Sequence, residues 1–363
     1  MKNVMLYAYT YFNLGDDLFI KLIAERYPDT QFMLVAPKAY KHAFKERHNI
    51  RILPSDTIIR RGIHFMFKTM GILRFSRPYI SKNCDAAVLI GGSLFIQGQN
   101  WRETMKMTKA MPIKGKPFFL LGANFGPFHE QEFYQEHKYL FQHYTDICFR
   151  DTYSYELFND LNHVRVADDI VFHLQKQTTQ KSQDDGYIVI TVIKPSIREN
   201  LSGYDAMYYT KIKDIAIYFM DKGYPVTFMS FCAFEADEEA IIEIMQKISP
   251  NYASRITTYA YKYHIDEALR IIARSTFVIA SRFHAMILGW VYQKPVFPIV
   301  YSDKMKHVMV DLDFNGSYID MDNVQKLTAE QVYMSMETNS QAVRAQVKNA
   351  EKQFEKLDAY LLQ

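Results

Sequence analysis

The sequence predicts an α/β protein with two facing Rossmann-like domains, each built on a parallel β-sheet. Its 363 residues exceed the size of a typical single domain. In both halves short apolar runs alternate with helix-like stretches, a pattern typical of a parallel sheet covered by helices. The polar segment 178–186 (TTQKSQDDG) interrupts this alternation and is the expected hinge.

The apolar runs place the individual elements. In the first half we expect strands at 4–8, 32–36, 86–90, 118–121 and 147–149, with a helix ending near residue 27 after the first strand. In the second half we expect strands at 187–193, 226–230, 276–280 and 296–300, and helices at 208–222, 235–247 and 283–292. The predicted divisions are an N-terminal domain 1–177, a C-terminal domain 187–327 and a helical tail 328–363.

The tail carries an apolar stripe with a spacing of three or four residues. The stripe consists of Val343, Val347, Ala350, Phe354, Leu357 and Leu361. The simpler interpretation is an amphipathic tail that packs on the protein's own surface. A partner chain is the alternative, so the oligomeric state stays open.

Composition narrows the class of protein. Hydrophobic residues make up 48% and charged residues 23%, which is typical of globular proteins. A net charge of +3 is too small to indicate a nucleic-acid partner. Cys84, Cys148 and Cys232 are far apart and suggest reduced thiols in the cytoplasm, without a zinc site. No signal peptide and no apolar run of about 18 residues is visible, so we expect a cytoplasmic protein without membrane spans.

Segment 60–82 has a different composition. It holds six Lys and Arg residues, no Asp or Glu, and several interleaved aromatic residues. Such a composition suits peripheral contact with the inner face of an anionic membrane. A solvated, partly buried helical pair between strands is the alternative.

The segment 280–285 (ASRFHA) is the strongest candidate site. It follows an apolar strand and opens a helix, whose N-terminus favours anions. Arg282 adds parallel donors suited to a carboxylate or a phosphate, and His284 adds a group that donates a proton near neutral pH. A helix cap at Ser281 and a surface ion pair of Arg282 would explain the same residues equally well.

Other strand ends carry polar or glycine-rich segments. Arg150 ends one strand of the first half, and Lys304 follows the last strand of the second half. Glycine loops contain Gly91, Gly92 and Ser93, and the segment 121–128 contains Asn124. The first strand runs into Asn13, Gly15, Asp16 and Asp17, which suit either sugar hydroxyls or a turn with a helix cap.

Taken together and in order, these segments resemble the polysaccharide pyruvyl transferase family. The resemblance rests on NLGDD, GGSLF, GANFGPF, FRDTYS, ADDIVF, FMSFCAFEADEEAI and SRFHAMILGWVYQKPVFPIVYSDK. It extends from about residue 9 to about residue 304, and SRFHA is its most specific part. Ser93 stands where many members carry a third glycine, which leaves the role of that loop open.

The resemblance implies a fold similar to the two-domain GT-B glycosyltransferases and a function in surface-polysaccharide synthesis. Phosphoenolpyruvate would donate a pyruvyl group to two hydroxyls of a sugar or lipid-linked oligosaccharide, with release of phosphate and without a metal or further cofactor. The resemblance places Arg150, Arg282 and His284 at the family's donor-binding positions. We expect His284 and Arg282 to be catalytic, with His284 acting as the acid or else as a phosphate ligand. Ser281, Phe283 and Lys304 are the further residues expected to bind the donor.

The same resemblance places the acceptor on the N-terminal domain and the donor on the C-terminal domain. The loop residues Asn13, Gly15, Asp16, Asp17, Gly91, Gly92, Ser93 and Asn124 are the expected acceptor side. Two alternatives remain. A nucleotide-sugar glycosyltransferase of this fold commonly carries paired glutamates in the C-terminal domain, and no Glu occurs here between Glu267 and Glu330. The other alternative is a non-catalytic glycan-binding relative.

Overall fold

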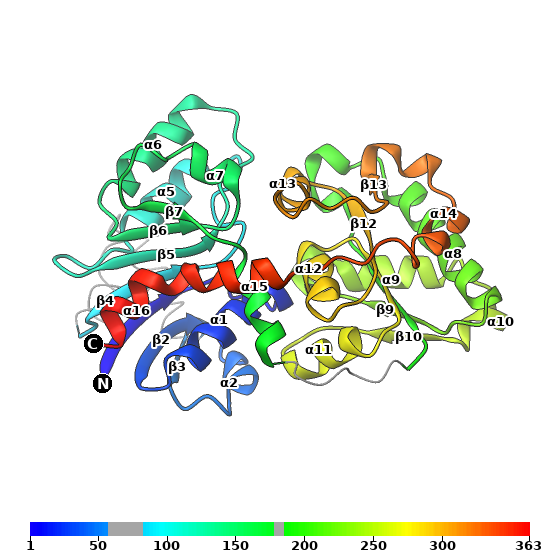
Figure 1. Ribbon diagram of the computed structural model, residues 1–363, viewed down its shortest axis with the longest axis horizontal. Coiled ribbons are helices and arrows are strands. Elements are labelled where there is room, and N and C mark those ends of the chain that lie inside the picture. Colours follow the sequence, from blue (N-terminus) through cyan, green and yellow to red (C-terminus); the bar gives the residue numbers. More distant parts are fainter. Residues whose placement is uncertain (57–82, 178–184) are drawn as a thin grey trace. The chain divides into compact units, whose positions relative to one another are not determined.

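The computed structural model describes residues 1–56, 83–177 and 185–363 (Figure 1). The predicted membrane segment 60–82 and most of the predicted hinge lie outside these residues. The chain forms two compact units. Unit 1 contains Met1–Thr10, Leu18–Ile170 and Lys348–Gln363, and unit 2 contains Tyr11–Asp17 and Val171–Val347. This division differs from the predicted one, because a short N-terminal segment belongs to unit 2 and the end of the tail belongs to unit 1.

Unit 1 holds a seven-stranded parallel sheet in the order β3-β2-β1-β4-β5-β6-β7. The strands are β1 (Lys2–Tyr7), β2 (Thr30–Ala36), β3 (Ile50–Pro54), β4 (Ala86–Ile90), β5 (Phe118–Ala123), β6 (Asp146–Phe149) and β7 (Val164–Val166). The helices are α1 (Leu14–Arg26), α2 (Tyr40–Ala43), α5 (Trp101–Lys109), α6 (Gln131–Phe141) and α7 (Thr152–Glu156). The strand order reverses between β1 and β4.

Unit 2 repeats this arrangement with a six-stranded sheet in the order β10-β9-β8-β11-β12-β13, again all parallel. The strands are β8 (Ile188–Thr191), β9 (Val226–Met229), β10 (Ile256–Tyr259), β11 (Phe277–Ala280), β12 (Val296–Val300) and β13 (Ile319–Asp320). The helices are α8 (Asp205–Asp221), α9 (Asp237–Met245), α10 (Pro250–Ala253), α11 (Ile265–Ala273), α12 (Phe283–Val291), α13 (Asp303–Asp311) and α14 (Ala329–Met334). Here the order reverses between β8 and β11.

Burial explains why the central strands were visible in the sequence. Every residue of β4 and β12 is buried, as expected for strands covered by helices on both faces. Both strands match their predicted ranges. The prediction of two α/β domains with parallel sheets is therefore confirmed.

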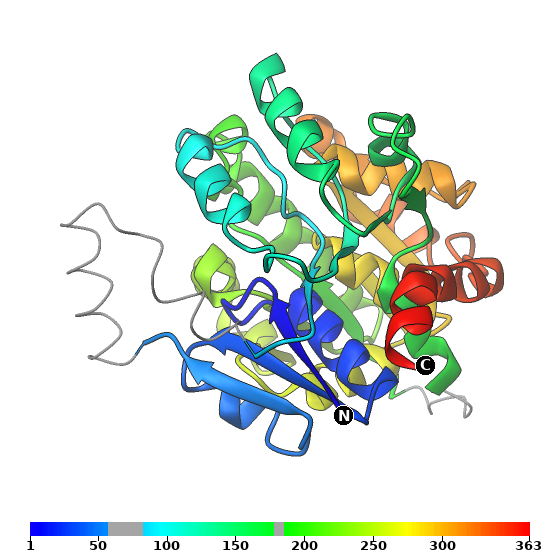
Figure 2. The same ribbon diagram turned by 90° about the vertical axis from the view of Figure 1, so that its left-hand side faces the viewer.

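The C-terminal tail consists of α15 (Arg344–Ala350), a 3₁₀ turn at Glu351–Phe354 and α16 (Glu355–Leu361). Its apolar stripe is buried at Ala350, Phe354 and Leu357, so the prediction that it packs on the protein's own surface is confirmed. Arg26, the last residue of α1, forms ion pairs with Glu351 at 2.8 Å and with Asp358 at 2.6 Å. Figure 2 shows the tail beside α1 in unit 1.

Candidate functional site

The site in unit 2 begins where β8 and β11 end, at the reversal of strand order. Ligands of open α/β sheets bind at this position. Ser281, directly after β11, is buried. Its backbone N–H donates to Thr191 Oγ1 at 3.1 Å, and its hydroxyl accepts from the Tyr208 hydroxyl at 2.7 Å. Ser281 therefore anchors the strand end, whereas the N-cap of α12 is Arg282, which makes no side-chain cap bond.

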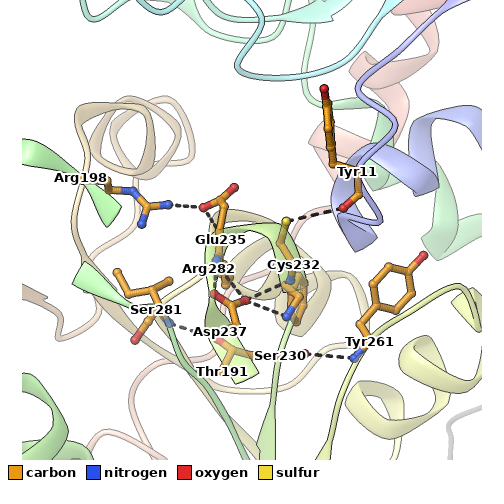
Figure 3. Close-up of polar contacts among 12 residues, drawn as sticks. Tyr11, Thr191, Arg198, Ser230, Cys232, Glu235, Asp237, Tyr261, Ser281 and Arg282 are labelled. Carbon is orange, nitrogen blue, oxygen red and sulfur yellow. Dashed lines mark hydrogen bonds and ion pairs between the residues drawn. The ribbon is translucent and has the colours of Figure 1, made fainter. Parts of the chain in front are cut away.

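Arg282 is held by two carboxylates of its own unit (Figure 3). Its Nε donates to Asp237 Oδ2 at 3.0 Å, its Nη2 donates to Asp237 Oδ1, and its Nη1 donates to Glu235 Oε2 at 2.6 Å. The residue is only 4% exposed. Burial alone would lower the pKa of Arg282, but Asp237 and Glu235 outweigh it and raise that pKa well above its usual range. The guanidinium is thus a buried cation with carboxylate partners.

Asp237, the first residue of α9, also fixes the preceding loop. Its Oδ2 accepts the backbone N–H groups of Phe231 at 2.9 Å and of Cys232 at 3.0 Å. A single carboxylate therefore connects Arg282 to the loop that carries Glu235. Neither carboxylate was predicted as a site residue from the sequence. The acidic cluster 235–239, a few residues after β9, was the signal that could have found them.

Arg198 and Lys304 add two further cations around Tyr301. Arg198 donates to Glu235, and its guanidinium carbon lies 4.4 Å from the centre of the Tyr301 ring. Lys304 Nζ lies 5.7 Å from the same ring and 5.6 Å from that of Phe283. The structure thus brings the predicted residues Phe283 and Lys304 together. Arg198 was missed, because it lies in an irregular segment between two short 3₁₀ turns that gave no pattern.

The cluster gathers positive charge. Arg198 and Arg282 pair with Glu235, Arg282 pairs also with Asp237, and Lys304 lies beside the same Tyr301 ring as Arg198. Burial alone would raise the pKa of Tyr301, but Lys304, Arg198 and Arg282 outweigh it and bring that pKa below its usual range. Similarly, burial opposes ionisation of Glu235, yet Arg282 and Arg198 lower its pKa to about 2. The local potential therefore favours anions.

His284 is partly exposed in the first turn of α12 and is packed against Gly15, which lies in the first turn of α1 directly after the loop at Asn13. A Cβ atom on Gly15 would overlap the His284 ring, so only glycine fits there without displacing the ring. The loop is tied to unit 2 by a bridge between Asn13 and Cys232. The segment predicted as an acceptor loop thus belongs to the same unit as Arg282.

The predicted residues Asn13, Asp16 and Asp17 have different surroundings. The Asn13 side-chain oxygen accepts from the Gly15 N–H at 3.0 Å, and Asn13 and Asp16 are partly exposed. Asp17 is fully buried and accepts from the Tyr261 hydroxyl at 2.6 Å. Asn13 and Asp16 are thus accessible to a ligand, whereas Asp17 stabilises the loop.

Unit 1 has a comparable arginine at the end of β6. Arg150 is 3% exposed, and its Nη1 donates to Asp169 Oδ2 at 3.0 Å. Its Nη2 donates to Asn124 Oδ1 at 2.6 Å, and the same oxygen accepts from the Ser93 hydroxyl at 3.3 Å. The structure therefore gathers Arg150, Asn124 and Ser93. Asp169 was missed, although it lies in the segment ADDIVF.

The glycine loop after β4 closes over this arginine. A Cβ atom on Gly92 would overlap the Arg150 guanidinium. The Gly92 carbonyl accepts from the Asn124 N–H at 3.0 Å, and the Gly91 N–H donates to the Leu121 carbonyl at 3.3 Å. The predicted glycine loop thus shapes the surroundings of Arg150.

Sequence comparison decides the family. The model of the family described as polysaccharide pyruvyl transferase matches residues 13–303, which is most of the chain. The chain belongs to the polysaccharide pyruvyl transferase family. The matched region includes both arginine clusters, and the family's activity implies a sugar or polysaccharide acceptor.

Solved structures place this pyruvyl transferase family member in the GT-B fold. HepE of Anabaena, in complex with UDP and glucose, is 13% identical with a TM-score of 0.61, and the alignment covers 99% of each chain. The UDP-GlcNAc 2-epimerase of Methanocaldococcus jannaschii, in complex with UDP-GlcNAc and UDP, is 11% identical with a TM-score of 0.60, covering 99% of this chain and 100% of that one. At such identities the likeness concerns the fold alone.

The described residues contain neither a candidate metal cluster nor a helix suited to span a membrane. Among residues 1–56, 83–177 and 185–363, no group of three or more His, Cys, Asp or Glu side chains is placed to hold a metal ion. Over the same ranges no helix has the length and apolar character needed to cross a bilayer.

Proposed function

We propose that this protein transfers a pyruvyl group from phosphoenolpyruvate to two hydroxyls of a sugar in a surface polysaccharide or its precursor. The product would be a pyruvate ketal, with release of phosphate. The observation that carries the proposal is the gathering of Arg198, Arg282 and Lys304 at the strand ends of unit 2 in a member of this family. A donor with a carboxylate and a phosphate matches that charge.

The geometry divides the donor-binding roles. Arg198 and Lys304 are the partly exposed cations of the cluster, and we assign them to the anionic groups of the donor. Arg282 is buried and engaged by Asp237 and Glu235, so it acts by positioning its neighbours. Arg150 has the corresponding role in unit 1, where it organises the glycine loop.

His284 is the proposed acid. Its proton would go to the methylene carbon of phosphoenolpyruvate, converting the methylene to a methyl group and making C2 electrophilic. One sugar hydroxyl would add to C2 and lose its proton to the base form of His284. The second hydroxyl would displace phosphate, which leaves with the remaining proton. The two new C–O bonds replace one C–O bond and the C=C π bond, so no oxidant, reductant or cofactor is needed.

The partly exposed residues Asn13 and Asp16 are assigned to the acceptor hydroxyls. Asn13 directly precedes α1 and Asp16 lies in its first turn, which packs against His284 through Gly15. An acceptor bound there would meet the proposed acid within one unit. Ser281 and Asp17 are buried and support the site, and Phe283 packs beside Lys304.

The test is phosphate release from phosphoenolpyruvate with and without a panel of simple and lipid-linked glycosides. We expect acceptor-dependent release by the parent and a loss of about 10²- to 10⁴-fold in His284→Ala, the range typical of general acid catalysis. His264→Ala, a change at an exposed histidine of the same unit, is the matched control. A kcat for His284→Ala within a few-fold of the parent would contradict the acid role.

A further inference from the structure

Two exposed aromatic rings lie side by side in unit 2. Tyr11 is 51% exposed and Phe234 is 67% exposed. Their ring centres are 4.8 Å apart, with an angle of 37° between the ring planes. Most aromatic side chains of this unit are buried or partly buried, and an exposed pair of adjacent rings offers an apolar surface that a ligand can contact.

The backbone holds both rings in place. Tyr11 and Phe234 come from segments joined by the Asn13–Cys232 bridge and by a hydrogen bond from Leu14 N–H to the Phe231 carbonyl at 3.0 Å. The Cys232 thiol also lies 3.9 Å from the Tyr11 carbonyl, as Figure 3 shows. Both rings are therefore ordered before any ligand arrives, which lowers the entropic cost of binding.

The same loop carries the charged cluster. Phe234 directly precedes Glu235, which binds Arg198 and Arg282, and Asp237 fixes the loop backbone. A ligand on the rings would thus lie beside the proposed donor-binding residues.

Backbone conformation at these segments points to function as well. Phe12, next to Tyr11, has φ 53°, and Ala236, two residues after Phe234, has φ 58°. Left-handed backbone is uncommon for residues other than glycine and costs on the order of 1–3 kcal/mol. Such conformations cluster at binding sites, where the surrounding structure holds a side chain in a required position.

We propose that Tyr11 and Phe234 form a stacking platform for one pyranose ring of the acceptor glycan. The apolar C–H face of a sugar ring would lie on the outward face of one of the two rings, with the other ring supporting it from behind, and its hydroxyls would reach polar groups such as Asn13. The assignment of this sugar as the acceptor rests on the proposed pyruvyl transfer. The platform would set how the acceptor is oriented.

Size and charge favour this occupant. Two aromatic side chains have roughly 300–500 Å² in total, of which Tyr11 and Phe234 expose 51% and 67%, so the platform is far below the ~800 Å² that each partner contributes to a stable protein interface. That area matches a single sugar ring. Phosphoenolpyruvate is a small dianion or trianion without an extended apolar face. We therefore expect the donor to gain little by contact with these rings.

The experiment measures glycoside binding directly. The probes are the methyl glycosides of glucose, galactose, mannose and N-acetylglucosamine, and the readout is saturation-transfer NMR on the full chain. We expect binding of at least one glycoside, weakened roughly three- to tenfold by Tyr11→Ala or Phe234→Ala. Phe234→Tyr should restore binding, and Tyr318→Ala, a change at a tyrosine that is 45% exposed in the same unit, should leave it unchanged.

Phosphoenolpyruvate binding, measured on the same variants, separates the two proposals. If the alanine variants lose the glycoside and keep the donor, the platform is supported. If no glycoside binds the parent, or if the alanine variants bind it as tightly as the parent, the platform is overturned while pyruvyl transfer still stands. If glycosides bind through the rings but phosphoenolpyruvate does not bind, the platform stands and pyruvyl transfer fails.

Discussion

Both units place a buried arginine at the end of a parallel strand but surround it differently. Arg150 follows β6 in unit 1, where it donates to Asp169 and to the amide oxygen of Asn124. Arg282 follows β11 in unit 2, the first strand after the reversal of strand order, where two carboxylates hold it and Arg198 joins through Glu235. A strand end thus positions each arginine, whereas its neighbours determine whether the site attracts an anion.

A second contrast between the two units concerns the side chain that packs against a glycine in each of them. In unit 1 Gly92 lies against the Arg150 guanidinium, so the glycine shapes a buried ion pair. In unit 2 Gly15 lies against the ring of His284, which is partly exposed. One close approach stabilises the structure and the other positions a group that we assign to proton transfer.

The largest effect on stability is expected from removing the carboxylate partner of either arginine. Asp237→Asn removes one of the two carboxylates that hold the buried Arg282, and Asp169→Asn removes the carboxylate that accepts from the buried Arg150, so each should cost about 3–5 kcal/mol. Equilibrium unfolding in urea measures the loss. Glu238→Gln, at a partly exposed acid next to Asp237, should change stability by less than about 0.5 kcal/mol. A near-neutral result at Asp237 or Asp169 would mean that the arginine there is not held as described.

A pH dependence should distinguish unit 2 from unit 1. Arg282 and Arg198 overcome burial and lower the pKa of Glu235 from 4.5 to about 2, so the folded state favours the carboxylate. This stabilisation is present above about pH 4.5 and is lost as the pH falls toward about 2, and it amounts to about 3 kcal/mol. Unfolding measured across this range should show a flatter profile for Glu235→Gln. Equal slopes for parent and variant would contradict the description of Glu235.

The smallest effects are expected from adding one methyl group at each glycine contact. Gly15→Ala and Gly92→Ala should each cost about 1–3 kcal/mol, because the methyl group displaces a packed side chain. Phosphate release should fall in Gly15→Ala through displacement of His284. Gly203→Ala and Gly98→Ala are the matched controls, since nothing lies within 4 Å of a Cβ at either position. Indistinguishable behaviour of the four variants would remove the steric argument.

The central strands of both sheets could be predicted from the sequence, whereas the edge strands β7 and β10 could not. Continuous apolar runs such as β4 and β12 signal burial on both faces. The missed strand β10 is partly exposed and carries Thr257 and Thr258, so it lacks that signal. The missed strand β7 has only three residues. Short and polar edge strands depend on pairing with a neighbour, which no local pattern reveals.

The candidate site shows the same division. Strand ends and glycines directed attention to Arg282, His284 and Arg150, and the structure places Arg150 and Arg282 directly after strands and His284 in the first turn of α12. The partners of these residues come from distant segments, since Asp237 is 45 residues away from Arg282. Membership of Tyr11–Asp17 in unit 2 likewise depends on long-range pairing with Cys232. Such contacts form only in the folded chain, so the spacing of residue types along the sequence does not predict them.

The most direct test of the account is calorimetric titration of phosphoenolpyruvate into the parent, Arg198→Gln and Lys304→Gln. Lys262→Gln, a change at an exposed lysine of the same unit, is the control. We expect the parent to bind phosphoenolpyruvate, and each site variant to bind it roughly 10- to 100-fold more weakly, as for loss of a charged hydrogen bond. Equal affinity in parent and site variants, or preferential binding of UDP-glucose, would contradict the claim that this cluster binds the pyruvyl donor.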